Sequence, residues 1–163
     1  MKYQVALSAP YPNVENVRKN PMDAKKLMNS YGGRNSETGA ILTYAYQSYV
    51  VKKEHPELAS MLEQVAVVEM KHHELLGTAI YSLGGLPVVA GRNAYFSAAG
   101  LDYSVRAEEF LVRNVREEEA AIREYEALEK TLATPEMREL VKRIVEDELL
   151  HVKLFSETLA KMH

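Results

Sequence analysis

The sequence has 163 residues, which is enough for one ordinary domain with a buried core. Its 20 basic and 23 acidic residues give a net charge of −3, so it lacks the strong positive balance that nucleic-acid binding requires. It contains no cysteine, which excludes disulfides, thiolate metal sites, cysteine nucleophiles and iron centres held by four cysteines.

Residues 1–19 are predicted to form an extended arm, because prolines interrupt them and they contain few core-forming runs. The first eleven residues lack the apolar segment of a signal peptide. No later run reaches the roughly 18 consecutive apolar residues that a membrane span needs. We therefore expect a cytoplasmic protein without a membrane partner.

Two helices are predicted in the first half of the chain. The first spans about residues 21–53, with Asn20 as its N-cap and a proline at its first position, and it ends before Pro56. Gly32 and Gly33 interrupt it, and they either kink the helix or let another backbone come close. The second helix spans about residues 56–83 and ends at two glycines.

Two further helices are predicted over about residues 104–132 and 135–161, after a long loop at 86–103. The connections within each helix pair are short, so the paired helices should be antiparallel. The loop of about 18 residues reaches ~60 Å, more than the ~42 Å length of one helix. The sequence thus predicts an all-α fold, a single domain over 1–163 that forms a four-helix bundle with a long crossover between the second and third helices.

Two Glu-x-x-His motifs are the strongest indication of a metal site. They run from Glu69 to His72 and from Glu148 to His151, and residues three apart share one face of a helix. A carboxylate and an imidazole on one face can bind the same metal ion. One such motif alone is typical of a solvated helix face, so the interpretation depends on the repetition.

A second motif, Glu-x-x-Ala-Ile-x-x-Tyr, also occurs twice and starts at Glu37 and at Glu118. These glutamates precede the glutamates of the Glu-x-x-His motifs by 32 and 30 residues, which indicates an internal duplication of a helical hairpin. Helical bundles hold dinuclear metal centres with a ligand set of this kind. The predicted ligands are Glu37, Glu69, His72, Glu118, Glu148 and His151.

Four carboxylates and two imidazoles favour iron or manganese, because oxygen-rich ligands prefer the harder ions. The four glutamates carry a charge of −4, which two divalent ions would neutralise. Two neighbouring ions that each change oxidation state by one can exchange two electrons with hydrogen peroxide or dioxygen. The sequence leaves open which metal is bound and which glutamates bridge the two ions.

Several other residues are candidates for supporting the ligands. Asp147 either bonds the outer nitrogen of a ligand histidine across the bundle or lies exposed. Tyr44 and Tyr125 lie two turns after the glutamates of their motifs, where they either bond a ligand carboxylate or pack in the core. His73 also lies one turn from a candidate ligand, but the corresponding position in the second half is Val152, so it is not selected.

The sequence resembles the ferritin-like superfamily over nearly its whole length. The stretch from Tyr31 to Tyr44, together with Glu69-Met70-Lys71-His72, is most similar to non-haem manganese catalases and their spore-coat relatives. The form Asp147-Glu148-x-x-His151 is more similar to di-iron oxidases and rubrerythrin-type proteins. Ala121 stands where the rubrerythrin pattern has an additional glutamate.

This resemblance implies a catalase-type or peroxidase-type oxidoreductase that decomposes hydrogen peroxide at a dinuclear manganese or iron centre. The alternatives are a ferroxidase or iron-storing protein, and a structural spore-associated protein with a vestigial site. We also expect a homodimer or higher homo-oligomer, since the arm would have little to pack on in a monomer. The loop at 86–103 is expected to cover one end of the bundle and to restrict access to small molecules.

Overall fold

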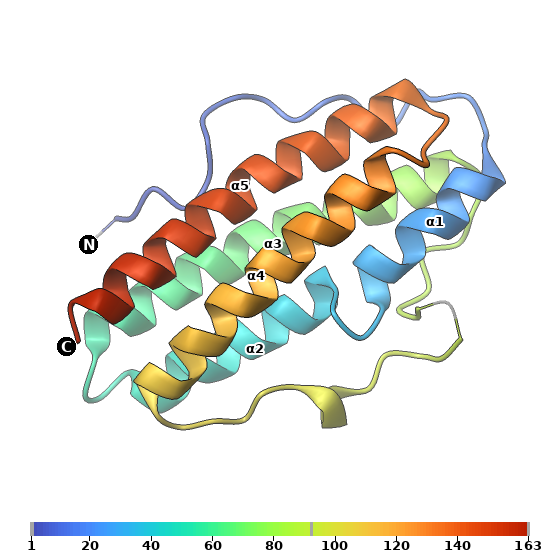
Figure 1. The fold of residues 1–163 in the computed structure, drawn as a ribbon. Helices are drawn as coiled ribbons and strands as arrows, with labels where there is room; N and C mark the ends of the chain where they lie inside the picture. Colours follow the sequence, from blue (N-terminus) through green and yellow to red (C-terminus); the bar gives the residue numbers. More distant parts are fainter. Residues whose placement is uncertain (1, 92, 163) are drawn as a thin grey trace.

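The computed structural model describes residues 2–91 and 93–162, so Met1, Arg92 and His163 lie outside the described residues. Its elements form an elongated bundle (Figure 1). They are α1 (Pro21–Gly32), α2 (Glu37–Val51), α3 (Pro56–Ser82), the short 3₁₀ helix η1 (Ala98–Gly100), α4 (Ala107–Glu129) and α5 (Pro135–Ala160). The predicted all-α bundle with a long crossover is confirmed. None of the helices in 2–91 and 93–162 combines the length and apolarity needed to cross a membrane.

The helix predicted over 21–53 is two helices. α1 ends at Gly32, and residues 33–36 are not helical before α2 begins at Glu37. A Cβ atom on Gly32 would lie 2.7 Å from the backbone nitrogen of Ala90, so the break admits the backbone of the crossover. Ser36 caps the new helix, because its side chain accepts a hydrogen bond from the Gly39 N–H. The break therefore places Glu37 at the first position of a helix.

Residues 83–106 form the crossover, which runs along the side of the bundle beside α2 (Figure 1). The expectation that it covers one end of the bundle is wrong. The end of α3 and the start of α4 lie at different ends of the bundle, so the chain must travel its length between them. The crossover packs against α2, where Leu101 and Phe96 lie within 3.8 Å of the position a Cβ of Gly39 would take.

Two apolar clusters fill the bundle on either side of its middle. One contains Leu76 and Ile144, and the other contains Leu62 and Phe155. Along α3 and α5, the polar motif residues fall between these clusters. Each fully buried large apolar side chain contributes about 1.5–3 kcal/mol, which helps to offset the cost of burying charged groups at the centre.

The N-terminal arm, residues 2–19, lies along α5 of its own chain (Figure 1). The Leu7 N–H donates a hydrogen bond of 2.8 Å to Asp147, and the side chain of Val14 is buried in an apolar cluster. The premise that the arm has little to pack on in a monomer is therefore wrong. Side chains of α3 and α5 satisfy its backbone groups, as at Tyr3, whose N–H donates to Gln64.

Candidate metal centre

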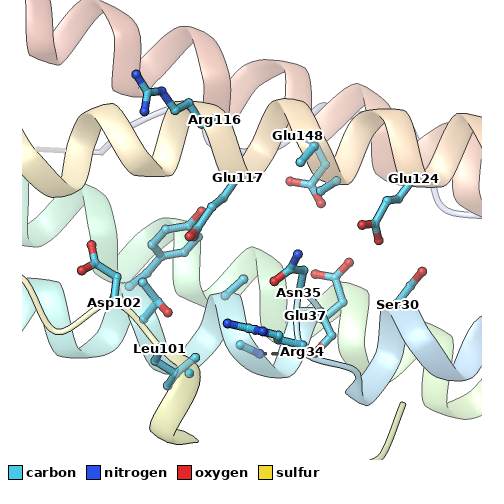
Figure 2. A pocket seen from close by; sticks show the side chains of 18 of the residues that line it. Ser30, Arg34, Asn35, Glu37, Leu101, Asp102, Arg116, Glu117, Glu124 and Glu148 are labelled. Carbon is cyan, nitrogen blue, oxygen red and sulfur yellow. Dashed lines mark hydrogen bonds between the residues drawn. The ribbon is translucent and has the colours of Figure 1, made fainter. Parts of the chain in front are cut away.

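All six predicted ligand side chains converge at the middle of the bundle, and none is more than 4% exposed. Four helices supply them, so that each half of the duplicated sequence contributes two glutamates and one histidine. Figure 2 shows Glu37 and Glu148, from α2 and α5, extending toward one another across a pocket.

The donor atoms form two groups of four, each with its atoms within 4.8 Å of one another. The first group is Glu37, Glu69, His72 and Glu148, and the second is Glu69, Glu118, Glu148 and His151. Glu69 and Glu148 belong to both groups. Only a carboxylate that belongs to both groups could bridge two ions, so this arrangement favours Glu69 and Glu148 as the bridging candidates. Glu37 and Glu118 would each bind one ion.

The shared carboxylates are oriented so that each presents one oxygen to each histidine. Nδ1 of His72 lies 3.0 Å from Oε2 of Glu69 and 3.3 Å from Oε1 of Glu148. Nδ1 of His151 lies 3.0 Å from Oε1 of Glu69 and 2.9 Å from Oε2 of Glu148. Both imidazoles therefore turn Nδ1 toward the glutamates, and the two oxygens of each shared carboxylate are divided between the two groups.

In the metal-free protein, protons bound to the donor groups offset the charge of the clustered carboxylates. Burial, with the neighbouring charge of Glu148, raises the pKa of the Glu118 carboxyl to about 8. Burial alone would lower the pKa of His72, but the surrounding carboxylates raise it well above its ordinary value. Oε1 of Glu69 is buried beside Nδ1 of His151, which lies 3.0 Å away, and within the part of the chain that the structure describes it makes no other polar contact of hydrogen-bond geometry. Carboxylate and imidazole donors in two such groups fit a dinuclear manganese or iron site.

Each of the two tyrosines bonds a candidate ligand that belongs to the other half of the molecule. Tyr44 on α2 donates a hydrogen bond to Glu118 on α4, and Tyr125 on α4 donates to Glu37 on α2. Neither tyrosine bonds the glutamate of its own motif, since seven residues along a helix separate them by about 10 Å. Both possibilities that the sequence left open hold, because each tyrosine bonds a candidate ligand and its ring is also buried in one of the apolar clusters.

Asp147 is fully buried, so the possibility that it lies exposed is wrong. Its Oδ2 lies 3.2 Å from Nε2 of His72, across the bundle. Burial alone would raise the pKa of the Asp147 carboxyl, but hydrogen bonds from His72, Tyr11, Arg143 and the Leu7 N–H lower it to about 2. The group therefore stays ionised and acts as a hydrogen-bond acceptor for the histidine.

Sequence reasoning missed the groups that the N-terminal arm brings to the site. Nε2 of His151 lies 2.9 Å from the backbone carbonyl oxygen of Val5, and the Tyr11 hydroxyl donates to Asp147. Arg143 pairs with Asp147 at 2.8 Å, and its spacing of four residues on a helix is a signal that could have found it. A backbone carbonyl carries no such signal. His73 lies outside the ligand groups, and its ring stacks on Tyr31.

A cavity of about 170 Å³ leads from the surface between α2 and α4 to the candidate ligands Glu37 and Glu148 (Figure 2). Its wall mixes charged, polar and apolar groups from α4, the crossover and the α1–α2 break. They include Arg34, Asn35, Leu101, Asp102, Arg116, Glu117 and Glu124. Small solutes therefore have a route to the centre of the bundle.

The family model for rubrerythrin matches residues 33–159, a span that includes all six candidate ligands. The chain belongs to the rubrerythrin family. The matched span excludes the N-terminal arm and α1, although both pack against the rest of the bundle. No curated protein sequence matches this rubrerythrin-family chain.

Two solved structures share the fold of this rubrerythrin-family protein. KatB, a manganese catalase from Anabaena PCC7120, superimposes with a TM-score of 0.86 at 23% sequence identity, over 99% of this chain and 81% of that chain. A bacterioferritin from Desulfovibrio desulfuricans with a diiron site superimposes with a TM-score of 0.70 at 24% identity. That match covers 86% of this chain and 82% of the bacterioferritin.

Proposed function

We propose that this rubrerythrin-family protein is an oxidoreductase that decomposes hydrogen peroxide at a dinuclear manganese or iron centre. The observation that carries the proposal is the pair of four-donor groups that share Glu69 and Glu148. In each group, one unshared glutamate and one histidine would complete the ligands of a single ion. The likeness of the fold to a manganese catalase supports peroxide as the substrate.

The protein's own residues would hold the centre in place and admit the substrate. Two ions bound there, each changing oxidation state by one, would supply two-electron chemistry: two electrons given to one peroxide molecule break its oxygen–oxygen bond to yield water, and two electrons taken from a second peroxide yield dioxygen. Tyr44 and Tyr125 hold the unshared carboxylates by hydrogen bonds, which fixes their orientation. The cavity ends at Glu37 and Glu148, so a molecule as small as peroxide can reach this side of the centre.

Oxidation of ferrous iron is the second candidate. The same donor groups suit iron, and the bacterioferritin with the similar fold has a diiron site. Asp102, Glu117 and Glu124 line the cavity and favour the entry of cations, although Arg34 and Arg116 lie beside them. A purely structural role with a vestigial site is less well supported, because all six candidate ligands are buried and converge.

The test is oxygen evolution from hydrogen peroxide, without a reductant, by protein loaded separately with manganese and with iron. We expect evolution with at least one metal, and its loss in Glu148→Gln. Glu139→Gln, which changes an exposed glutamate on the same helix, is the matched control and should keep the activity. Absence of oxygen with both metals, together with rapid oxidation of added ferrous iron, would favour the second candidate.

We also propose that the chain forms a homo-oligomer. The N-terminal arm packs on its own chain and therefore does not argue for an oligomer. Large apolar side chains on α2 and α3 are exposed, however, among them Tyr49 at 69%, Val67 at 60% and Tyr81 at 68%. Apolar side chains that form a contiguous exposed patch favour association between chains. A monomeric mass by light scattering at micromolar concentration would contradict the proposal.

A further inference from the structure

The N-terminal arm contacts the outer nitrogen of one candidate histidine ligand directly and that of the other through Asp147. The cavity opens between α2 and α4, whereas the arm lies against α3 and α5. Nε2 of His151 lies 2.9 Å from the carbonyl oxygen of Val5 in the arm. Nε2 of His72 lies 3.2 Å from Asp147, which the arm contacts from outside.

The arm holds Asp147 by two hydrogen bonds. The Leu7 N–H donates to Oδ1 at 2.8 Å, and the Tyr11 hydroxyl donates to Oδ2 at 2.6 Å. Oδ2 is also the oxygen that faces His72, so the arm sets the position of the atom that the imidazole contacts. The ring of Tyr11 lies edge-on to the His72 ring, with 6.0 Å between the centroids.

The path of the arm is itself fixed at several points. Arg143 donates to the carbonyl oxygens of Leu7 at 2.9 Å and Ala9 at 3.0 Å, and its guanidinium lies 4.5 Å from the centre of the Tyr11 ring. Val14 is only 3% exposed and packs in an apolar cluster. The segment that contacts the histidine side of the site is therefore anchored by side chains of the bundle.

We propose that the N-terminal arm is a positioning strap that orients both histidines for metal binding. A neutral imidazole can bind a metal through Nδ1 only if its proton is on Nε2. A backbone carbonyl and a carboxylate can only accept hydrogen bonds, so Val5 and Asp147 both require a proton on Nε2. The strap thus leaves Nδ1 of each ring free to face Glu69 and Glu148.

The two histidines depend on the strap in different ways. His151 bonds the arm directly, through a backbone atom that no side-chain substitution removes. His72 depends on the arm through Asp147, which Arg143 also holds at 2.8 Å. Loss of the first residues of the arm should therefore lower the affinity for the ion beside His151 more than the affinity for the ion beside His72.

The experiment compares deletion of residues 2–8 with deletion of residues 2–4. The longer deletion removes the Val5 carbonyl and the Leu7 N–H, whereas the shorter one removes only the contacts of Tyr3 with α3. Manganese binding is measured by competition with a chelator. We expect the longer deletion to lower the affinity for one of the two ions by about 10–100-fold, the usual effect of losing a group that supports a ligand. The shorter deletion should leave both affinities unchanged.

A second readout follows the ring N–H groups by ¹⁵N NMR in protein loaded with zinc, a diamagnetic ion. We expect Nε2–H resonances from His72 and His151 in the full chain, and loss or rapid exchange of the His151 resonance in the longer deletion. Wild-type affinity for both ions together with unchanged resonances would overturn the proposal. If the longer deletion fails to fold, the variant Tyr11→Phe tests the proposal instead. A lower affinity for one ion and a shifted ring N–H resonance of His72 would support the strap. Affinity and resonance equal to those of the wild type would overturn it.

This inference rests on the metal-binding part of the proposed function and not on the reaction with peroxide. The two can fail separately. The ring N–H exchange rates are also compared in metal-free protein, where faster exchange at His151 in the longer deletion supports the strap and an unchanged rate contradicts it. A full chain that binds no metal would instead contradict the proposed function.

Discussion

Tyr44 on α2 donates a hydrogen bond to Glu118 on α4, so this bond joins the α2–α3 hairpin to the α4–α5 hairpin. The reverse bond, from Tyr125 to Glu37, completes a reciprocal pair. The two halves of the duplicated sequence therefore hold each other's unshared carboxylates. The closure of the bundle and the geometry of the candidate centre depend on the same contacts.

Tyr44→Phe should destabilise the metal-free protein by about 1–3 kcal/mol, the usual cost of leaving a buried polar group without its hydrogen-bond partner. The substitution removes the hydroxyl that bonds Glu118 while keeping the ring that packs 5.4 Å from Phe155. Chemical denaturation measures the change. Tyr49→Phe, on the same helix but 69% exposed, is the control and should change stability by less than about 0.5 kcal/mol. Equal effects of the two substitutions would contradict the assignment.

The metal-free protein should lose stability as the pH rises from about 5 to about 8. Burial raises the pKa of Glu118 in the folded protein to about 8 from an ordinary value of 4.5, so the folded state binds more protons than the unfolded state in this window. Stability that depends on this proton is present at low pH and is lost as the pH rises through the folded pKa. Manganese affinity should change in the opposite direction, because the ion competes with the proton.

Glu118→Gln should reduce this slope without abolishing it, because burial also raises the pKa of Glu37. The measurement is the free energy of unfolding by denaturant at several pH values in a chelating buffer. A wild-type protein whose stability rises over the same window would contradict the account of the buried carboxylates.

Asp147→Asn should destabilise the protein by about 3 kcal/mol, because it removes the buried carboxylate that lies 2.8 Å from Arg143. Glu146→Gln is the control, because it removes an exposed carboxylate that lies 3.9 Å from the same guanidinium and should cost little. The Asp147 pKa of about 2 lies below its ordinary value of 3.8, so its contribution is present above pH 4 or so. It is lost as the pH falls toward 2. The wild type should therefore lose more stability on acidification than the variant, as followed by thermal unfolding.

The convergence of the candidate ligands could be predicted from the sequence because helical spacing determines which side chains share a face. Glu69 and His72 lie three residues apart in an apolar stripe, and the same pattern returns at Glu148 and His151. The duplication then excluded His73, which in the structure stacks on Tyr31. Periodicity and repetition are local properties, so they carry over directly from sequence to fold.

The break in the first helix and the role of the arm depend on contacts between distant segments. A glycine lowers the stability of a helix by only about 1 kcal/mol, so two glycines do not by themselves predict that the helix ends. The sequence near Gly32 also does not show that the backbone at Ala90 packs against it. The arm has no periodicity, and its most direct contact with the site is the carbonyl oxygen of Val5, a group that every residue has. Such contacts become visible only when the bundle is assembled.

The central claim is that Glu69 and Glu148 are shared by two metal ions. Elemental analysis of protein loaded with manganese and freed of loosely bound ions tests it most directly. We expect two ions per chain in the wild type and in the control Glu139→Ala, and at most one in Glu69→Ala and in Glu148→Ala, since each of these removes a ligand of both ions. Retention of two ions per chain in either variant would contradict the account.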